Sequence, residues 1–163
     1  MVEALQVRLE DLRRPEWRPL FVGDRERYAT ATAVRLLDPR TLVCCALLAR
    51  KIYLIRFDLA AGSHTVLSRA DTTYGGVSTE IDLCDADDRG NVVTSNCEGG
   101  AMSLYRVAGD TIHHTRDLPT GLSGNYCHGA RLFGPDVVVA TVLRPPRGVQ
   151  FFDLRTMRKL LFV

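Results

Sequence analysis

The sequence predicts an all-β protein in which a unit of four antiparallel strands occurs about three times, behind a short N-terminal helix. Three observations predict this fold class. Beyond Trp17, short apolar runs alternate with Gly, Pro, Asp and Asn, which is typical of strands joined by tight turns. No later segment keeps a helical spacing of apolar residues over three turns. A pattern of residues also recurs after roughly 95–96 positions, which indicates internal repetition.

The helix is expected within residues 1–17. Its apolar residues are Val2, Leu5, Leu9 and Leu12, a spacing that places them on one side of a helix. We expect it to end before Pro15, because the residue that precedes a proline avoids helical geometry.

The remaining chain, residues 18–163, is expected to form one β domain. Its apolar runs have the length of strands, and turn-forming residues such as Asp38-Pro39 and Gly134-Pro135 separate them. The expected strands, in order, are Leu20–Val22, Ala31–Leu37, Leu42–Leu48, Ile52–Asp58, Thr65–Ser68, Glu80–Cys84, Val92–Asn96, Met102–Val107, Thr111–Thr115, Gly129–Phe133, Val137–Leu143, Val149–Asp153 and Lys159–Phe162.

The repeat groups these strands into units. The segment from Ala33 to Leu59 matches the segment from Gly129 to Leu154, and a middle unit that begins at Glu80 fits between them. The matching residues are Arg35-Leu36 with Arg131-Leu132, Pro39 with Pro135, and Phe57-Asp58-Leu59 with Phe152-Asp153-Leu154. Four antiparallel strands in about 40–50 residues are the signature of a β-propeller blade. The chain therefore predicts a partial β-propeller of about three blades, at 28–72, 78–120 and 125–163.

Particular residues resemble known propeller families. The segment from Val149 to Leu161 resembles the end of a WD-repeat unit, with Phe152 where tryptophan is usual, and His128-Gly129 resembles the Gly-His pair of that family in reversed order. The middle unit resembles the Asp-x-Gly-Asn blades of gluconolactonase-like and NHL-type propellers, through Asp88-Arg89-Gly90-Asn91. The resemblance extends over residues 28–163, and no unit carries a full signature of either family.

Composition and charge exclude two classes of binding partner, nucleic acids and membranes. The chain has 163 residues, of which 46% are hydrophobic and 25% charged, and its net charge is +2. This charge is too small for a nucleic-acid-binding surface, and no apolar run approaches the roughly 18 residues that cross a bilayer. The N-terminus lacks the apolar region of a signal peptide. Five scattered cysteines without a Cys-x-x-Cys pair indicate buried thiols, so we expect a cytoplasmic protein without nucleic-acid or membrane partners.

The candidate binding residues are Glu80, Asp82, Asn125 and His128. The first strand of a blade lines the central channel of a propeller, so the resemblance places these residues at the channel mouth. Glu80 and Asp82 would share one face if their strand were regular. In lactonase-like propellers an acid near the position of Glu80 binds a metal, but the other two units have Gly129 and Ala33 at that position. We therefore expect no metal, no cofactor and no catalytic residue.

Two other polar groups have structural explanations. Asp85, Asp87 and Asp88 resemble a calcium loop but lack the glutamate and the flanking helices of an EF-hand, so we expect them to form a turn. His113 and His114 are adjacent on a weak outer strand, where each ring would point to a different face and be exposed.

The function that the sequence favours is a non-catalytic interaction or scaffold module, which presents its rim loops to a protein or peptide partner. One alternative is a metal-dependent lactonase-like hydrolase, with Glu80 as metal ligand and His128 or Asp82 as acid or base. Another is a truncated propeller fragment without independent activity. Because three blades leave two open ends, a homodimer that completes a six-blade ring is also expected.

Overall fold

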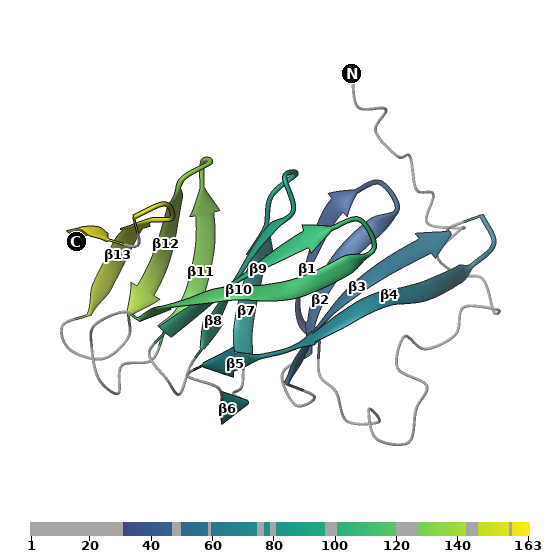
Figure 1. The fold of residues 1–163 in the computed structure, drawn as a ribbon, viewed down its shortest axis with the longest axis horizontal. Helices are drawn as coiled ribbons and strands as arrows, with labels where there is room; N and C mark the ends of the chain where they lie inside the picture. Colours follow the sequence, from purple (N-terminus) through teal and green to yellow (C-terminus); the bar gives the residue numbers. More distant parts are fainter. Residues whose placement is uncertain are drawn as a thin grey trace.

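The fold consists of three four-stranded antiparallel sheets (Figure 1). The structure is a computed structural model that describes residues 31–46, 50–58, 60–74, 77–78, 81–96, 101–119, 127–142, 147–156 and 158–163. Sheet 1 comprises β1 (Ala31–Asp38), β2 (Thr41–Ala46), β3 (Lys51–Asp58) and β4 (Ser63–Asp71). Sheet 2 comprises β7 (Ile81–Ala86), β8 (Asn91–Asn96), β9 (Ala101–Ala108) and β10 (Thr111–Pro119). Sheet 3 comprises β11 (Cys127–Phe133), β12 (Val137–Val142), β13 (Gly148–Asp153) and β14 (Lys159–Phe162).

The all-β prediction is confirmed, as is the grouping of the strands into fours. No helix occurs in the described ranges, and so none of them contains a helix long and apolar enough to cross a membrane. The helix expected within residues 1–17 and the strand expected at Leu20–Val22 lie outside the described residues. The sequence did not predict the short hairpin of β5 (Thr73–Tyr74) and β6 (Val77–Ser78), which follows sheet 1.

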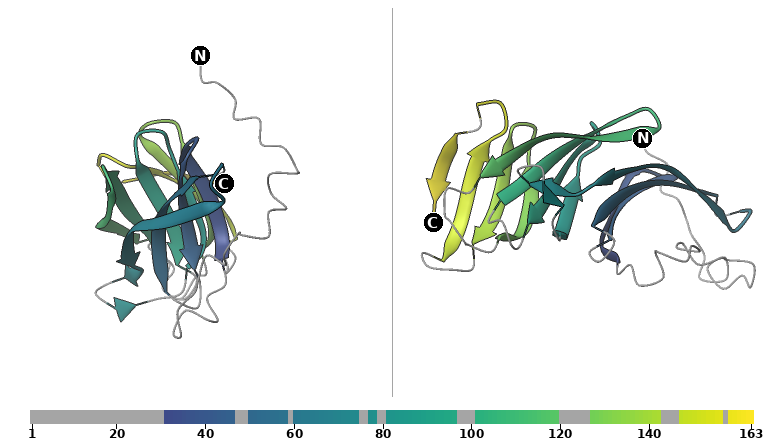
Figure 2. Two further views of the ribbon diagram at one scale, coloured as in Figure 1. Left: turned by 90° about the vertical axis from the view of Figure 1, so that its right-hand side faces the viewer. Right: turned by 60° about the horizontal axis from the view of Figure 1, so that its bottom comes forward.

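The sheets stand in a row in the order of the sequence (Figures 1 and 2). Each sheet is a simple meander in which consecutive strands pair. The first strands are neighbours, since β7 contacts both β1 and β11. The long fourth strands β4 and β10 contact each other at the other side of the row. First strands gathered on one side of successive sheets are a propeller-like arrangement.

The repeat is visible in the strand register. Arg35, Asp85 and Arg131 occupy equivalent positions, because each pairs with the central valine of the next strand, Val43, Val93 or Val139. The fourth strand of every sheet also has one extra residue at the same level, Leu67 in β4, Thr115 in β10 and Leu160 in β14. Such a bulge reverses the alternation of side chains beyond it.

Two apolar cores hold the sheets together. Between sheets 1 and 2 the buried residues include Val43 and Leu54, which face Val92 and Tyr105. Between sheets 2 and 3, Val93, Met102 and Leu104 pack against Val138, Ala140 and Phe152. Burial of a side chain of this size contributes about 1.5–3 kcal/mol, so each interface is a major source of stability.

The two ends of the row differ. On the side of sheet 1 that faces away from sheet 2, Cys44, Ala46, Tyr53 and Ile55 are buried. On the side of sheet 3 that faces away from sheet 2, the apolar residues are half-buried or exposed. This open face consists of Phe133, Val137, Val139, Phe151 and Leu161. The positions equivalent to Val139 in sheets 1 and 2, Val43 and Val93, are both 0% exposed.

Candidate functional site

Each sheet has two distinct edges. The hairpins between its first and second strands and between its third and fourth strands turn at one edge, which we call the turn edge. The first strands begin at the opposite edge. The predicted binding residues belong to that opposite edge: Asp82 lies near the start of β7, and His128 lies at the equivalent place in β11. Glu80 and Asn125 lie outside the described residues.

The structure brings the backbone positions of Asp82 and His128 to neighbouring strands, because β7 and β11 are in contact. Both residues fall where their strand is irregular, between Ile81 and Cys84 in β7 and between Cys127 and Gly129 in β11. Regular alternation therefore does not apply at Asp82, and because Glu80 lies outside the described residues, the shared face of Glu80 and Asp82 is not tested. Their role in binding stays a prediction.

Asp85 has a role that its expected place in a turn did not suggest. It lies in β7, its side chain is only 16% exposed, and its Oδ1 accepts a hydrogen bond from Arg35 Nε of sheet 1 at 2.9 Å. Its Oδ2 accepts a hydrogen bond from the backbone N–H of Leu132 in sheet 3 at 3.0 Å. One carboxylate thus connects the first strands of all three sheets.

Asp87 does form the expected turn. Its Oδ1 accepts hydrogen bonds from the backbone N–H groups of Arg89 and Asn91, at 3.0 and 2.8 Å. His113 and His114 are both exposed, as expected. The ring of His114 makes an edge contact with Tyr105, and its Nε2 lies 2.9 Å from Asp117. Among the described residues, no group of His, Cys, Asp and Glu could hold a metal ion.

The turn edge contains a groove between sheets 2 and 3, with a volume of about 570 Å³. Its floor is apolar and buried, formed by Leu104 and Leu154. Its polar lining comes from the hairpins and outer strands of both sheets: Asn91, Arg106, His113, Thr115, Arg116, Asp136 and Arg155. The volume falls within the range of pockets that bind small ligands or short peptide segments.

The equivalent groove between sheets 1 and 2 is smaller, about 270 Å³. The difference follows from two arginines at equivalent positions, Arg56 in β3 and Arg106 in β9. Arg56 reaches across to the next sheet, where its Nη2 lies 2.6 Å from Asp110 Oδ1. Arg106 instead donates to Asn91 Oδ1 of its own sheet at 2.6 Å. The Arg106 pair therefore does not bridge the groove between sheets 2 and 3.

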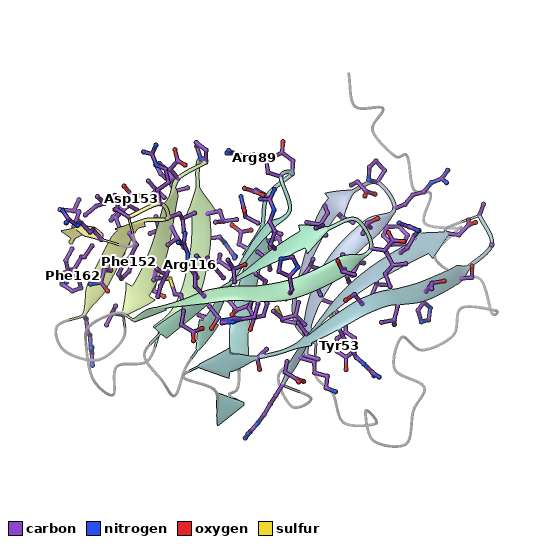
Figure 3. The ribbon with its side chains drawn as sticks, viewed as in Figure 1. Tyr53, Arg89, Arg116, Phe152, Asp153 and Phe162 are labelled. Atoms are coloured by element: carbon purple, nitrogen blue, oxygen red, sulfur yellow. The ribbon has the colours of Figure 1, made fainter. Side chains whose placement is uncertain are left out.

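The bulge in β10 places Arg116 in this groove (Figure 3). His114 pairs with Tyr105, whereas Arg116 pairs with Leu104, and Thr115 is the extra residue between them. If β10 were regular here, Arg116 would share the face of His114 and Tyr105, toward sheet 1. Because Thr115 is accommodated as a bulge, Arg116 faces sheet 3 with Leu104. There the Arg116 guanidinium donates a hydrogen bond to the backbone carbonyl of Leu154.

Sequence reasoning missed this groove. Alternation along β10 would have placed Arg116 on the same face as His114, and nothing in the sequence marks Thr115 as an extra residue. A scan against known protein families found no match for this chain, and neither did a search of curated proteins.

Proposed function

We propose that the chain is a non-catalytic interaction module of the β-propeller type, which binds a protein or peptide segment at the turn edge of its sheets. The observation that carries this proposal is the groove between sheets 2 and 3, with its apolar floor and polar walls. An apolar floor provides binding free energy, and a few polar groups orient the ligand. The predicted contact residues Glu80, Asp82, Asn125 and His128 would form a second contact region at the opposite edge.

The frame around the groove supports this function. Leu154 donates its backbone N–H to the carbonyl of Asp136 at 2.7 Å, which ties together the two hairpins of sheet 3 that line the groove. Through its hydrogen bond to the carbonyl of Leu154, Arg116 joins the β13–β14 hairpin to sheet 2. A preorganised groove loses little conformational entropy when a ligand binds.

Filling the groove tests the proposal. A random peptide library displayed on phage is selected on the purified chain, and the enriched peptides are then tested on two variants. Thr115→Trp places an indole in the groove, whereas Thr65→Trp places one at an exposed site on β4 of sheet 1. We expect the enriched peptides to bind the wild type and Thr65→Trp but not Thr115→Trp. Failure to enrich any peptide, or equal binding to both variants, would contradict the proposal.

We also propose a second copy of the chain as a partner, in an arrangement that completes a six-blade ring. Positions that are exposed at the sheet 1 end of the row have equivalents in sheet 3 that are buried by the neighbouring sheet. Val34 and Leu36 of β1 are 47% and 62% exposed, whereas Ala130, which is equivalent to Val34 in sheet 3, is 0% exposed under sheet 2. Because the centre of that side of sheet 1 is already buried, we expect the contact of the second copy to centre on β1.

A cytosolic location belongs to the same proposal. Cys44 and Cys45 are buried in the structure, as the sequence predicted for its cysteines, and thiols in such positions behave as small apolar side chains.

A further inference from the structure

The groove between sheets 2 and 3 differs from its counterpart between sheets 1 and 2 in charge as well as in size. The smaller groove is lined by two arginines, Arg56 and Arg89, and by two aspartates, Asp38 and Asp88. The larger groove is lined by three arginines, Arg106, Arg116 and Arg155, with a single aspartate, Asp136. His113 adds a further basic group. The larger groove therefore has an excess of positive charge that the repeat does not require.

The bonds that these arginines make leave guanidinium donors available to a ligand. Arg106 donates to a neutral amide oxygen, that of Asn91, so its charge is not neutralised by this bond. Arg155 Nε lies 3.7 Å from Asp136, a long contact between a largely exposed arginine and a partly exposed aspartate. Arg116 Nε is buried and has no hydrogen-bond partner in the part of the chain that the structure describes. A buried donor of this kind gains free energy when a ligand supplies an acceptor.

The arrangement of guanidinium groups above an apolar floor indicates the chemical class of the ligand. Guanidinium groups bind carboxylates through paired, charge-assisted hydrogen bonds, which are stronger than neutral ones. The floor below them is apolar, from Leu104 and Leu154. A matching segment has carboxylate side chains next to apolar ones.

We infer that the groove binds an acidic peptide segment, with glutamate or aspartate carboxylates on Arg106, Arg116 and Arg155 and an apolar side chain on the floor. This inference rests on the proposed function and names the ligand class of the same groove. In this complex a carboxylate oxygen accepts the Arg116 Nε hydrogen bond.

The test is fluorescence anisotropy with short labelled peptides on the full chain. The first peptide alternates glutamate with leucine, the second has glutamine in place of glutamate, and the third has phosphoserine in that place. We expect the glutamate peptide to bind about tenfold more tightly than the glutamine peptide, and this preference to weaken as salt is added.

Three variants assign the effect to the groove. Arg106→Gln and Arg155→Gln alter exposed side chains and should each weaken binding of the glutamate peptide several-fold without changing the melting temperature. Arg56→Gln is the matched control, because it removes an arginine at the position equivalent to Arg106 in sheet 1. It should leave binding unchanged.

The outcomes separate this inference from the proposed function. Equal affinity for the glutamate and glutamine peptides, with both lost in Thr115→Trp, would overturn the acidic ligand and leave the interaction groove intact. Binding of the phosphoserine peptide alone would also overturn it. An effect of Arg56→Gln equal to that of Arg106→Gln would show that peptides bind by overall charge. If no peptide binds and the library enriches none, both proposals fail.

Discussion

Asp85 Oδ1 lies 2.9 Å from Arg35 Nε, and this ion pair joins the first strand of sheet 2 to the first strand of sheet 1. The second oxygen of the same carboxylate accepts the backbone N–H of Leu132 in sheet 3. One side chain, which is 16% exposed, therefore adds a polar contact to each of the two apolar interfaces.

Replacing Asp85 should destabilise the whole row of sheets. In Asp85→Ala the backbone N–H of Leu132 and the half-buried Arg35 lose their shared acceptor, so we expect the free energy of unfolding to fall by about 2–3 kcal/mol. Urea denaturation followed by circular dichroism measures this change. The control is Asp88→Ala, which alters an exposed neighbour and should change the free energy by no more than about 0.5 kcal/mol. Equal effects of the two variants would contradict the bridging role of Asp85.

Alanine substitutions at two glycines of the turn edge distinguish the destabilisation caused by backbone strain from that caused by steric overlap. Gly90 and Gly109 both have positive φ, +79° and +57°. A Cβ at Gly90 would lie 2.7 Å from the carbonyl oxygen of Val107, whereas a Cβ at Gly109 would meet nothing within 4 Å. Thermal melts should therefore show a loss of about 1 kcal/mol for Gly109→Ala and a larger loss for Gly90→Ala. A smaller loss for Gly90→Ala would show that the β7–β8 hairpin moves to accept the methyl group.

Adjacent phenylalanines in β13 test which face of sheet 3 is open. Phe151 belongs to the open face, and Phe152, which is 3% exposed, packs against sheet 2. If a second copy covers the open face, multi-angle light scattering should give the mass of a dimer for the wild type and that of a monomer for Phe151→Lys. Phe152→Ala should instead lower the stability by about 3–5 kcal/mol. A wild-type monomer at high concentration would contradict the second-copy proposal.

The hairpin after β13 should respond to acid. The backbone N–H groups of Thr156 and Arg155 donate to Asp153, and these hydrogen bonds hold the pKa of its carboxyl below the ordinary value of 3.8. Because the pKa is lowered on folding, the stabilisation is present above pH 3.8 and is lost as the pH falls through the lower value of the folded state. A carboxyl NMR titration should place the midpoint of Asp153 below 3.8. A midpoint at or above that value would show that these hydrogen bonds are absent in solution.

Much of the fold could be predicted from the sequence because the strands follow simple physical rules. Val43, Cys45, Ile52 and Leu54 alternate with residues of the other face, and turn residues such as Asp87 bond to their own backbone. The match of Arg35 with Arg131 identified a true equivalence, since both pair with the central valine of the next strand.

The groove could not be predicted for an equally physical reason. Whether Thr115 forms a bulge or alternates regularly decides whether Arg116 faces sheet 3 or sheet 1, and a bulge leaves no clear mark in the composition of a strand. The link from Asp85 to Leu132 spans 47 residues, and alternation along a single strand says nothing about partners at that distance. Local patterns thus determine strands and turns, whereas contacts between sheets depend on how strands that are distant in the sequence pack together in space.

The row arrangement has a consequence for cooperativity. Sheet 2 packs on both of its faces, through Val92 on one side and Val93 on the other, both 0% exposed. In such a linear array, stability is the sum of what each layer contributes and what each junction adds, so the terminal layers open at the lowest cost. Amide hydrogens of β8 and β9 would then exchange only when the whole molecule unfolds, while those of β14 exchange through local opening.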